Sequence, residues 1–187
     1  MTDPLDDLEA VIAAAAAFER DPRPRAPKQL RILRKLSALL EATSGYEGIK
    51  CWRGKSVITA KETADTLSIL EAPRPIIGAP AAEGSVKRSE AWTLLVQGWP
   101  MDDPDEPSAP AYWMKAAVEQ QLSLVIAELP DGRQRKDGVY MLGGDISSLT
   151  IGQGVVRPPS EEAASRLAMF YLPVIVGLQT DVRNPYA

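Results

Sequence analysis

The chain has 187 residues, a formal net charge of −4 and 45% hydrophobic residues. It is long enough to bury a sizeable core, and this composition excludes a disordered chain and a membrane protein. The negative charge provides no field that would hold nucleic acid through counterion release. The single cysteine, Cys51, excludes an intramolecular disulfide and is typical of a reducing compartment, so we expect synthesis in the cytosol.

The first predicted helix stands apart from the rest of the chain. Apolar residues at spacings of three and four predict it from Leu5 to about Phe18 or Arg20. Its alanine-rich stripe buries little, and the acids before it argue against a signal peptide. Residues 21–27 carry three prolines and should form an extended connector. We therefore predict a helical arm with its connector over residues 1–26 and a single domain over residues 27–187.

The second predicted helix is better defined. Pro27 opens it, and Thr43-Ser44-Gly45 is expected to close it, with a glycine suited to the left-handed position after a helix. Short alternating runs predict strands over residues 49–53 and 66–71, and the proline-rich stretch 73–84 is predicted to be a loop that covers a sheet edge. The core face of the helix consists of Leu33, Leu36 and Leu40, flanked by Leu30, Ile32 and Leu39.

A basic belt spans the connector and the second helix. A solvated face is the simpler interpretation of such a belt. The alternative is that it meets a patch of opposite charge on a neighbouring subunit. Its members are Arg20, Arg23, Arg25, Lys28, Arg31, Arg34 and Lys35.

Residues 89–129 combine a strand, an acidic loop and a helix. Trp92, Leu94 and Val96 recur at every second position, which predicts a strand with one apolar face. Residues 100–107 cannot continue a sheet, because their three prolines lack an amide donor. The loop also carries the acids Asp102, Asp103, Asp105 and Glu106.

The helix after this loop has its own start signals. Ser108 offers an N-cap hydroxyl, and Pro110 lies in the first turn, where its missing N–H costs little. No core requires so long a loop between two well-defined elements. The residues on the apolar side of the helix are Met114, Val118, Leu122, Val125 and Leu129.

Two strands complete the chain. Residues 149–156 predict a strand in which Gly152 and Gly154 indicate a bulge or a close backbone approach. Residues 167–178 are the most strand-like run, in which Pro173 must lie at an edge or a bulge. This order of elements favours an α+β fold: an antiparallel β-sheet packed by two main α-helices, with the N-terminal helical arm attached.

The sequence contains no histidine. This removes Ser-His and Cys-His nucleophiles, imidazole general bases and most zinc sites. The acids of the loop 100–107 lack the glycine of an EF-hand, and the segment 152–154 lacks the third glycine of a dinucleotide fingerprint. We therefore expect no catalytic residue, no cofactor and no metal, and a protein that is not an enzyme.

The tryptophans differ in their expected surroundings. We expect Trp52 and Trp92 to pack in the core. Trp99 stands at a strand end beside the proline-rich loop, so we expect it at an interface.

Taken in order, several segments resemble the tail terminator proteins of long-tailed bacteriophages and related phage-like particles. The resemblance is one of pattern and order over roughly residues 28–178, and neither residues 1–26 nor 133–148 belong to it. The segments are Leu33-Arg34-Lys35-Leu36 to Gly45-Tyr46, Trp52-Arg53-Gly54, Leu67 to Glu71, Trp92 to Trp99 with Asp102-Asp103, Pro110 to Glu119, Leu149 to Gly152 with Val155 to Pro158, and Phe170 to Val174.

The resemblance implies a small α+β subunit that assembles into a closed homo-oligomeric ring, usually a hexamer. The ring would cap the finished tail tube and join it to the head connector or stopper protein. DNA would pass through its lumen without specific binding. The subunit would belong to the virion neck after synthesis in the cytoplasm of a bacterial host, with no membrane involved.

We expect the ring contacts to use the arm, the acidic loop and the ends of strands. The alternatives are another neck or minor tail protein, such as a head-tail connector, and a cytosolic module that binds a small ligand in a concave apolar pocket. The residues expected at interfaces are Arg23, Arg25, Arg53, Trp99, Met101, Asp102, Asp103, Asp105, Glu106 and Arg157.

Overall fold

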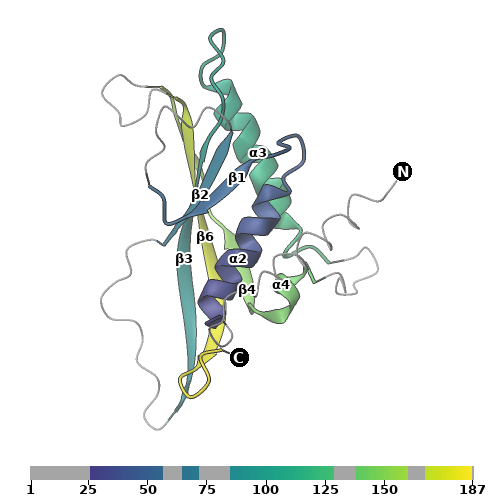
Figure 1. The fold of residues 1–187 in the computed structure, drawn as a ribbon, viewed down its shortest axis with the longest axis vertical. Helices are drawn as coiled ribbons and strands as arrows, with labels where there is room; N and C mark the ends of the chain where they lie inside the picture. The colour runs from purple at the N-terminus through teal and green to yellow at the C-terminus, as the bar shows by residue number, and fades with distance from the viewer. Residues whose placement is uncertain (1–25, 57–64, 72–84, 129–137, 160–166, 187) are drawn as a thin grey trace.

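The computed structural model describes residues 26–56, 65–71, 85–128, 138–159 and 167–186. Residues 1–25 of the predicted arm, the loop 73–84, Leu129 of the predicted helix stripe and the first part of residues 133–148 lie outside the described residues. The elements are α2 (Lys28–Glu41), β1 (Lys50–Arg53), β2 (Thr66–Glu71), β3 (Lys87–Trp99), α3 (Ala109–Ser123), α4 (Met141–Gly144), β4 (Ser148–Ile151), β5 (Val155–Arg157) and β6 (Met169–Asp181). A mixed six-stranded sheet with a small number of helices makes the fold α+β, which confirms the predicted class (Figure 1).

The sheet has the order β1-β2-β3-β6-β4, and β5 also pairs with β6. Four of its pairings are antiparallel, but β1 runs parallel to β2, with Lys50 opposite Thr66 and Arg53 opposite Ile69. The prediction of a purely antiparallel sheet is therefore wrong at this edge. Alternating residues show that a segment is a strand, whereas the direction of that strand depends on how its connections run.

Strands β3 and β6 form the longest part of the sheet (Figure 1). They pair from Lys87 opposite Asp181 to Gly98 opposite Phe170. The neighbouring β2 pairs with β3 only from Leu94 onward, so the first residues of β3 extend past it. The two long strands therefore separate two ends of the molecule. One end carries the start of β3, and the other carries the loop that leads to α3.

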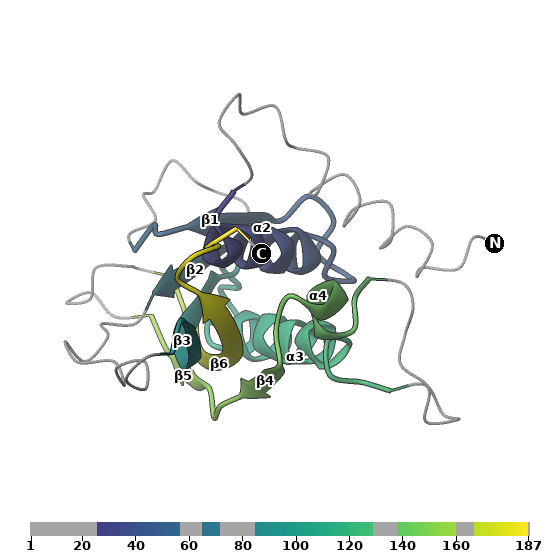
Figure 2. The same cartoon turned by 90° about the horizontal axis from the view of Figure 1, so that it is seen from below.

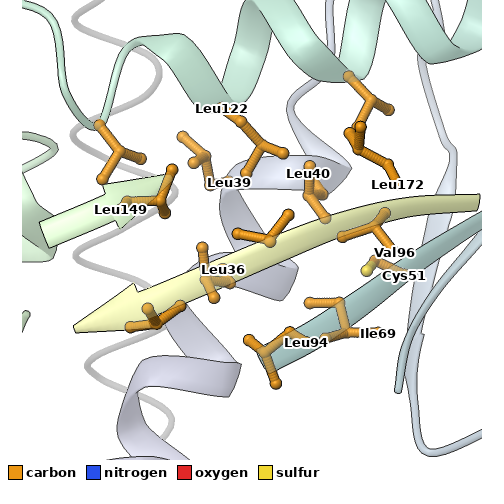
Figure 3. Packing of buried hydrophobic residues seen from close by; sticks show 14 of the residues in the cluster. Leu36, Leu39, Leu40, Cys51, Ile69, Leu94, Val96, Leu122, Leu149 and Leu172 are labelled. Carbon is orange, nitrogen blue, oxygen red and sulfur yellow. The ribbon is translucent and has the colours of Figure 1, made fainter. Parts of the chain in front are cut away.

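Helices α2 and α3 cover one face of the sheet, as Figures 1 and 2 show. Figure 3 shows Leu36, Leu39 and Leu40 of α2 and Leu122 of α3 directed toward the strands. The alternation of β3 is confirmed, because Trp92, Leu94 and Val96 are all buried on this face. The predicted stripe of α3 is buried as well, at Met114, Val118, Leu122 and Val125, although the helix itself ends at Ser123.

Local contacts fix how the two helices and the sheet meet. The Gln121 side chain is buried on α3 and donates a hydrogen bond of 3.1 Å from Nε2 to the carbonyl oxygen of Leu39 on α2. Gly98 faces the ring of Phe170 so closely that an added Cβ would collide with it. The first contact requires a polar side chain at position 121, and the second requires a residue without a Cβ at position 98. The pattern of apolar residues predicts neither requirement.

Pro173 lies in β6, an inner strand, where a missing amide donor would normally interrupt a ladder. On one side it is paired with Leu95 of β3. On the other side, its carbonyl accepts a 2.8 Å hydrogen bond from Gly152, in the gap between β4 and β5. The N–H and C=O of one strand residue point to the same side, so the missing donor faces this gap. The predicted strand 149–156 is thus two strands, and Pro173 is tolerated at the break between them.

The α4 segment is a left-handed turn. Met141 and Leu142 have φ values of 49° and 53°, and Gly143 and Gly144 have 69° and 85°. Such a conformation costs a non-glycine residue about 1–2 kcal/mol. The turn is held by a 2.8 Å hydrogen bond from the Met141 amide to the carbonyl of Val125, and by burial of Leu142 in the core.

Among the described residues, no helix is both long enough and apolar enough to span a bilayer.

Candidate interaction surface

The acidic loop between β3 and α3 has a defined shape. One carboxylate oxygen of Asp103, Oδ1, accepts hydrogen bonds from the amides of Asp105 at 2.9 Å and Glu106 at 3.3 Å. The Met101 amide donates a 2.8 Å hydrogen bond to Oδ1 of Asp65. The carboxylates of Asp103 and Asp65 thus accept hydrogen bonds from backbone N–H groups of the loop. These N–H groups have no partner in the sheet, because the prolines of the loop end the strand.

Most of the side chains of this loop face outward. Asp102, Asp105 and Glu106 are exposed and Asp103 is half-buried. None of these four carboxylates has an ion-pair partner in the part of the chain that the structure describes. The described residues also contain no group of acidic or cysteine side chains that could hold a metal ion. The loop therefore presents unpaired negative charge at one end of the molecule.

Ser108 occupies the predicted N-cap position of α3, but the prediction that its hydroxyl caps the helix is wrong. Ser108 forms no capping hydrogen bond, and its backbone is already helical, with φ −94° and ψ −21°. The α3 helix instead begins from a preceding turn, in which the Ala109 amide donates a 2.9 Å hydrogen bond to the carbonyl of Glu106. Pro110 does lie in the first turn, as predicted.

Two large aromatic side chains stand on α3 immediately after the loop. Trp113 is 73% exposed and Tyr112 is 61% exposed. Met101, in the loop, is 58% exposed. We call Tyr112 and Trp113 the aromatic surface. Sequence interpretation did not place these two aromatic residues at an interface. The signal was present, because the core stripe through Met114 and Val118 leaves the adjacent positions of the helix on its outer side.

The expectations for Trp52 and Trp99 are both wrong. Trp99 is only 3% exposed, because its sheet partner Thr66 and the following Pro100 are buried with it. Although Trp99 is the last residue of β3, its side chain is therefore covered within the subunit. Trp52 is 41% exposed, and the Nζ atom of Lys55 lies 4.6 Å from the centre of its ring. Trp92 is buried, as predicted.

The other expected interface residues do not converge on one place. Arg157 is exposed on β5, 5.3 Å from the Tyr171 ring centre, and its strand partner Met169 lies toward the same end as the acidic loop. Arg53 is exposed at the end of β1. Arg23 and Arg25 lie outside the described residues. The structure thus brings Met101 and the four acids together, with Arg157 toward the same end of the sheet and Arg53 apart from them at the end of β1.

The basic belt is divided by a cluster inside the subunit. Arg31 and Lys35 of α2 both bind Asp145, at 2.8 and 2.7 Å. Lys35 also donates a 2.7 Å hydrogen bond to the carbonyl of Leu142 in the left-handed turn. Burial opposes ionisation of Asp145, but the hydrogen bonds from these two cations outweigh it and lower its pKa. The alternative in which the whole belt meets a neighbouring subunit is therefore wrong for Arg31 and Lys35.

Exposed cations gather at the end of the molecule opposite the acidic loop. Arg183 is paired with Asp181 at 3.3 Å, but its side chain remains 71% exposed. Figure 1 places the start of β3 and the end of β6 at the lower end of the molecule and the acidic loop at the upper end. We call this group the basic end; its members are the exposed Lys87, Arg88 and Arg183 and the half-buried Lys28.

Cys51 has the surroundings of an unreactive thiol. It is buried in β1, and burial raises its pKa to about 12. A thiolate is the nucleophilic form of cysteine, so this side chain acts as a small apolar residue of the core.

No protein-family model matches the chain, and no curated protein matches it.

Proposed function

We propose that this chain is a structural subunit of a tailed bacteriophage or phage-like particle: a tail terminator that forms a ring, caps the tail tube and joins it to the head connector. The order of segments over residues 28–178 that resembles such proteins supports this proposal. The α+β fold is the class that the resemblance implies. As a fold class serves many functions, the argument depends on the surfaces of the subunit.

The observation that carries the proposal is the contrast between the two ends of the subunit. One end presents unpaired acids beside Met101, Tyr112 and Trp113, and the other presents exposed cations. Two different surfaces on one chain are what a head-to-tail contact requires, and such a contact closes into a ring when its rotation permits. Large exposed aromatic groups beside charged residues are also typical of protein interfaces.

The overall charge agrees with a conduit for DNA. A ring through which nucleic acid passes should not hold it tightly, and a chain of net charge −4 provides little attraction for phosphates. Any contact of the ring with the tail tube or the head connector would then depend on its protein surfaces.

Native mass spectrometry of the wild-type chain at micromolar concentration tests the self-association. We expect closed rings, or monomers in equilibrium with rings, without added metal or nucleotide. Electron microscopy with tail tubes from the same particle tests the specific role, because a terminator should bind one end of isolated tubes. A head-tail connector would instead bind heads and leave free tubes uncapped. A chain that stays monomeric both alone and with tail tubes would contradict the proposal.

A further inference from the structure

We infer that the aromatic surface at the start of α3 is the docking site for the basic end of a second copy of this chain. The inference rests on the proposed ring and deepens it, because it names the two surfaces that join neighbouring subunits. The partner is identified by charge and position, as the next paragraphs argue.

Within the described part of the chain, no other residue covers the aromatic surface. Trp113 and Tyr112 are 73% and 61% exposed, although they stand on a helix whose other side is fully packed against the sheet. Ala116, one turn further along the same side, is exposed as well. A small residue beside two aromatic rings lets a partner approach the helix closely. Tyrosine and tryptophan supply large contact area at low entropic cost, which makes such a group a candidate for the centre of an interface.

The charge around this surface determines the kind of partner. Asp105 and Glu106 are exposed within one short turn of the start of α3, and neither has an ion-pair partner in the described part of the chain. A partner must therefore bring positive charge to the rim of the aromatic surface. Lys87 and Arg88 at the start of β3 are exposed, and they too have no ion-pair partner among the described residues.

The basic end of the same subunit lies too far away to be this partner. Lys87 opens β3 and Trp99 closes it, so the 13 residues of the strand separate the basic end from the acidic loop. At about 3.3 Å per residue, this distance is about 40 Å. A second copy placed head to tail brings the two surfaces together, and each copy keeps one surface of each kind free for the next. This is the arrangement that a closed ring repeats.

The test uses two variants that each destroy one surface. The first carries Tyr112→Ser and Trp113→Ser, and the second carries Lys87→Glu and Arg88→Glu. We expect each variant alone to be folded by circular dichroism and monomeric at concentrations where the wild type forms rings. A mixture of the two should form a one-to-one heterodimer, because one intact pair of surfaces remains. Trp52→Ser removes an exposed indole on β1 and should assemble as the wild type does.

Zero-length carbodiimide cross-linking of the wild type provides a measurement that needs no variant. We expect cross-links from Asp105 or Glu106 to Lys87 or Lys28, which must join different copies because the two ends lie about 40 Å apart. Absence of these cross-links in assembled rings would overturn the inference.

The possible outcomes separate this inference from the proposed function. Rings that form equally well from either variant, or a mixture of folded variants that stays monomeric, overturn the inference and leave the ring proposal standing. Head-to-tail chains that use these surfaces but never bind tail tubes support the inference and contradict the terminator role. A wild-type chain that is monomeric under all conditions overturns both.

Discussion

Asp145 shows how one charged residue can hold an unusual backbone. Its carboxylate binds Arg31 and Lys35, and Lys35 in turn binds the carbonyl of Leu142 within the left-handed turn. The side chain of Asp145 is only 13% exposed, so these contacts are shielded from solvent. The contacts of this cluster offset part of the free-energy cost of the left-handed conformation. The hydrogen bonds of a right-handed helix cannot do so, because the turn does not form them.

We expect Asp145→Asn to lower the free energy of unfolding by about 1–2 kcal/mol at pH 7, because charge-assisted hydrogen bonds are lost. The pKa of Asp145 is lowered in the folded state, so its stabilising effect is complete above the unfolded pKa of about 3.9 and disappears as the pH falls through the lower folded value. Urea unfolding of both proteins at pH 7, 5 and 3 should therefore show a difference that narrows only at the lowest pH. Asp181→Asn removes an exposed pair with Arg183 and should have a much smaller effect. A difference that is constant across this pH range would contradict the role given to Asp145.

Gly98 tests the packing of the sheet against Phe170. Gly98→Ala should destabilise the fold by about 1–3 kcal/mol, because the new Cβ would collide with a ring that is fully buried. Phe170→Leu in the same chain removes the atoms that collide and should restore part of this loss. Thermal unfolding of the two single variants and the double variant forms a double-mutant cycle, in which the double variant should lose less stability than the sum of the two single losses. Additive losses would show that the strand shifts to admit the methyl group.

At the scale of elements, the outer edge of β1 is blocked by side chains of α2. The Cys51 amide donates a 3.0 Å hydrogen bond to Oε1 of Glu41, and the Cys51 carbonyl accepts one of 3.0 Å from Oγ of Ser37. An edge strand with free backbone groups invites pairing with another chain, and these contacts use both groups of the central residue. The helix thus packs on the sheet and also protects its edge.

We expect Glu41→Leu combined with Ser37→Ala to lower stability by about 1–3 kcal/mol, since two backbone groups of Cys51 lose their partners. The exposed edge should also speed aggregation on mild heating, which light scattering would detect. Glu41→Gln is the matched control, because its side-chain oxygen can still accept the hydrogen bond. Equal aggregation of the control and the double variant would show that charge, and not edge blocking, protects the strand.

Patterns of apolar residues predicted most elements of this fold and fewer of its contacts. The second helix, the strand of Trp92, Leu94 and Val96, and the stripe of α3 follow from local spacing, because burial on one face requires that spacing. The parallel direction of β1 and the ion pair between Arg31 and Asp145, which are 114 positions apart, depend on the tertiary arrangement and leave no local signal.

The sequence predicted the acidic loop of the candidate surface but not its aromatic residues, because only the loop has a local signal. A loop with four acids and three prolines cannot bury itself, so the exposure of its acids followed from composition. The burial of Trp99 and the exposure of Trp113 were harder to predict, because an aromatic residue is equally suited to a core and to an interface. Only the position of Trp113 beside the core stripe of α3 separates the two cases.

At the scale of the whole molecule, the acidic loop should serve association and not folding. We expect the combined change Asp102→Asn, Asp103→Asn, Asp105→Asn and Glu106→Gln to leave the melting temperature nearly unchanged. Exposed charges contribute little to stability, and Asn at position 103 keeps the oxygen that holds the loop.

The same variant should form rings about tenfold more slowly at low ionic strength, because the attraction between opposite charges mainly accelerates encounter. Assembly of the wild type should slow as salt rises, whereas the variant should respond little, and light scattering during assembly would measure both. Glu47→Gln with Glu128→Gln neutralises exposed carboxylates outside the loop and should retain the salt dependence of the wild type. Unchanged assembly of the fourfold variant would make the loop a simple connector between β3 and α3. Loss of folding would instead mean that its acids stabilise the subunit itself, since only a charge with an internal partner can matter that much to the folded state.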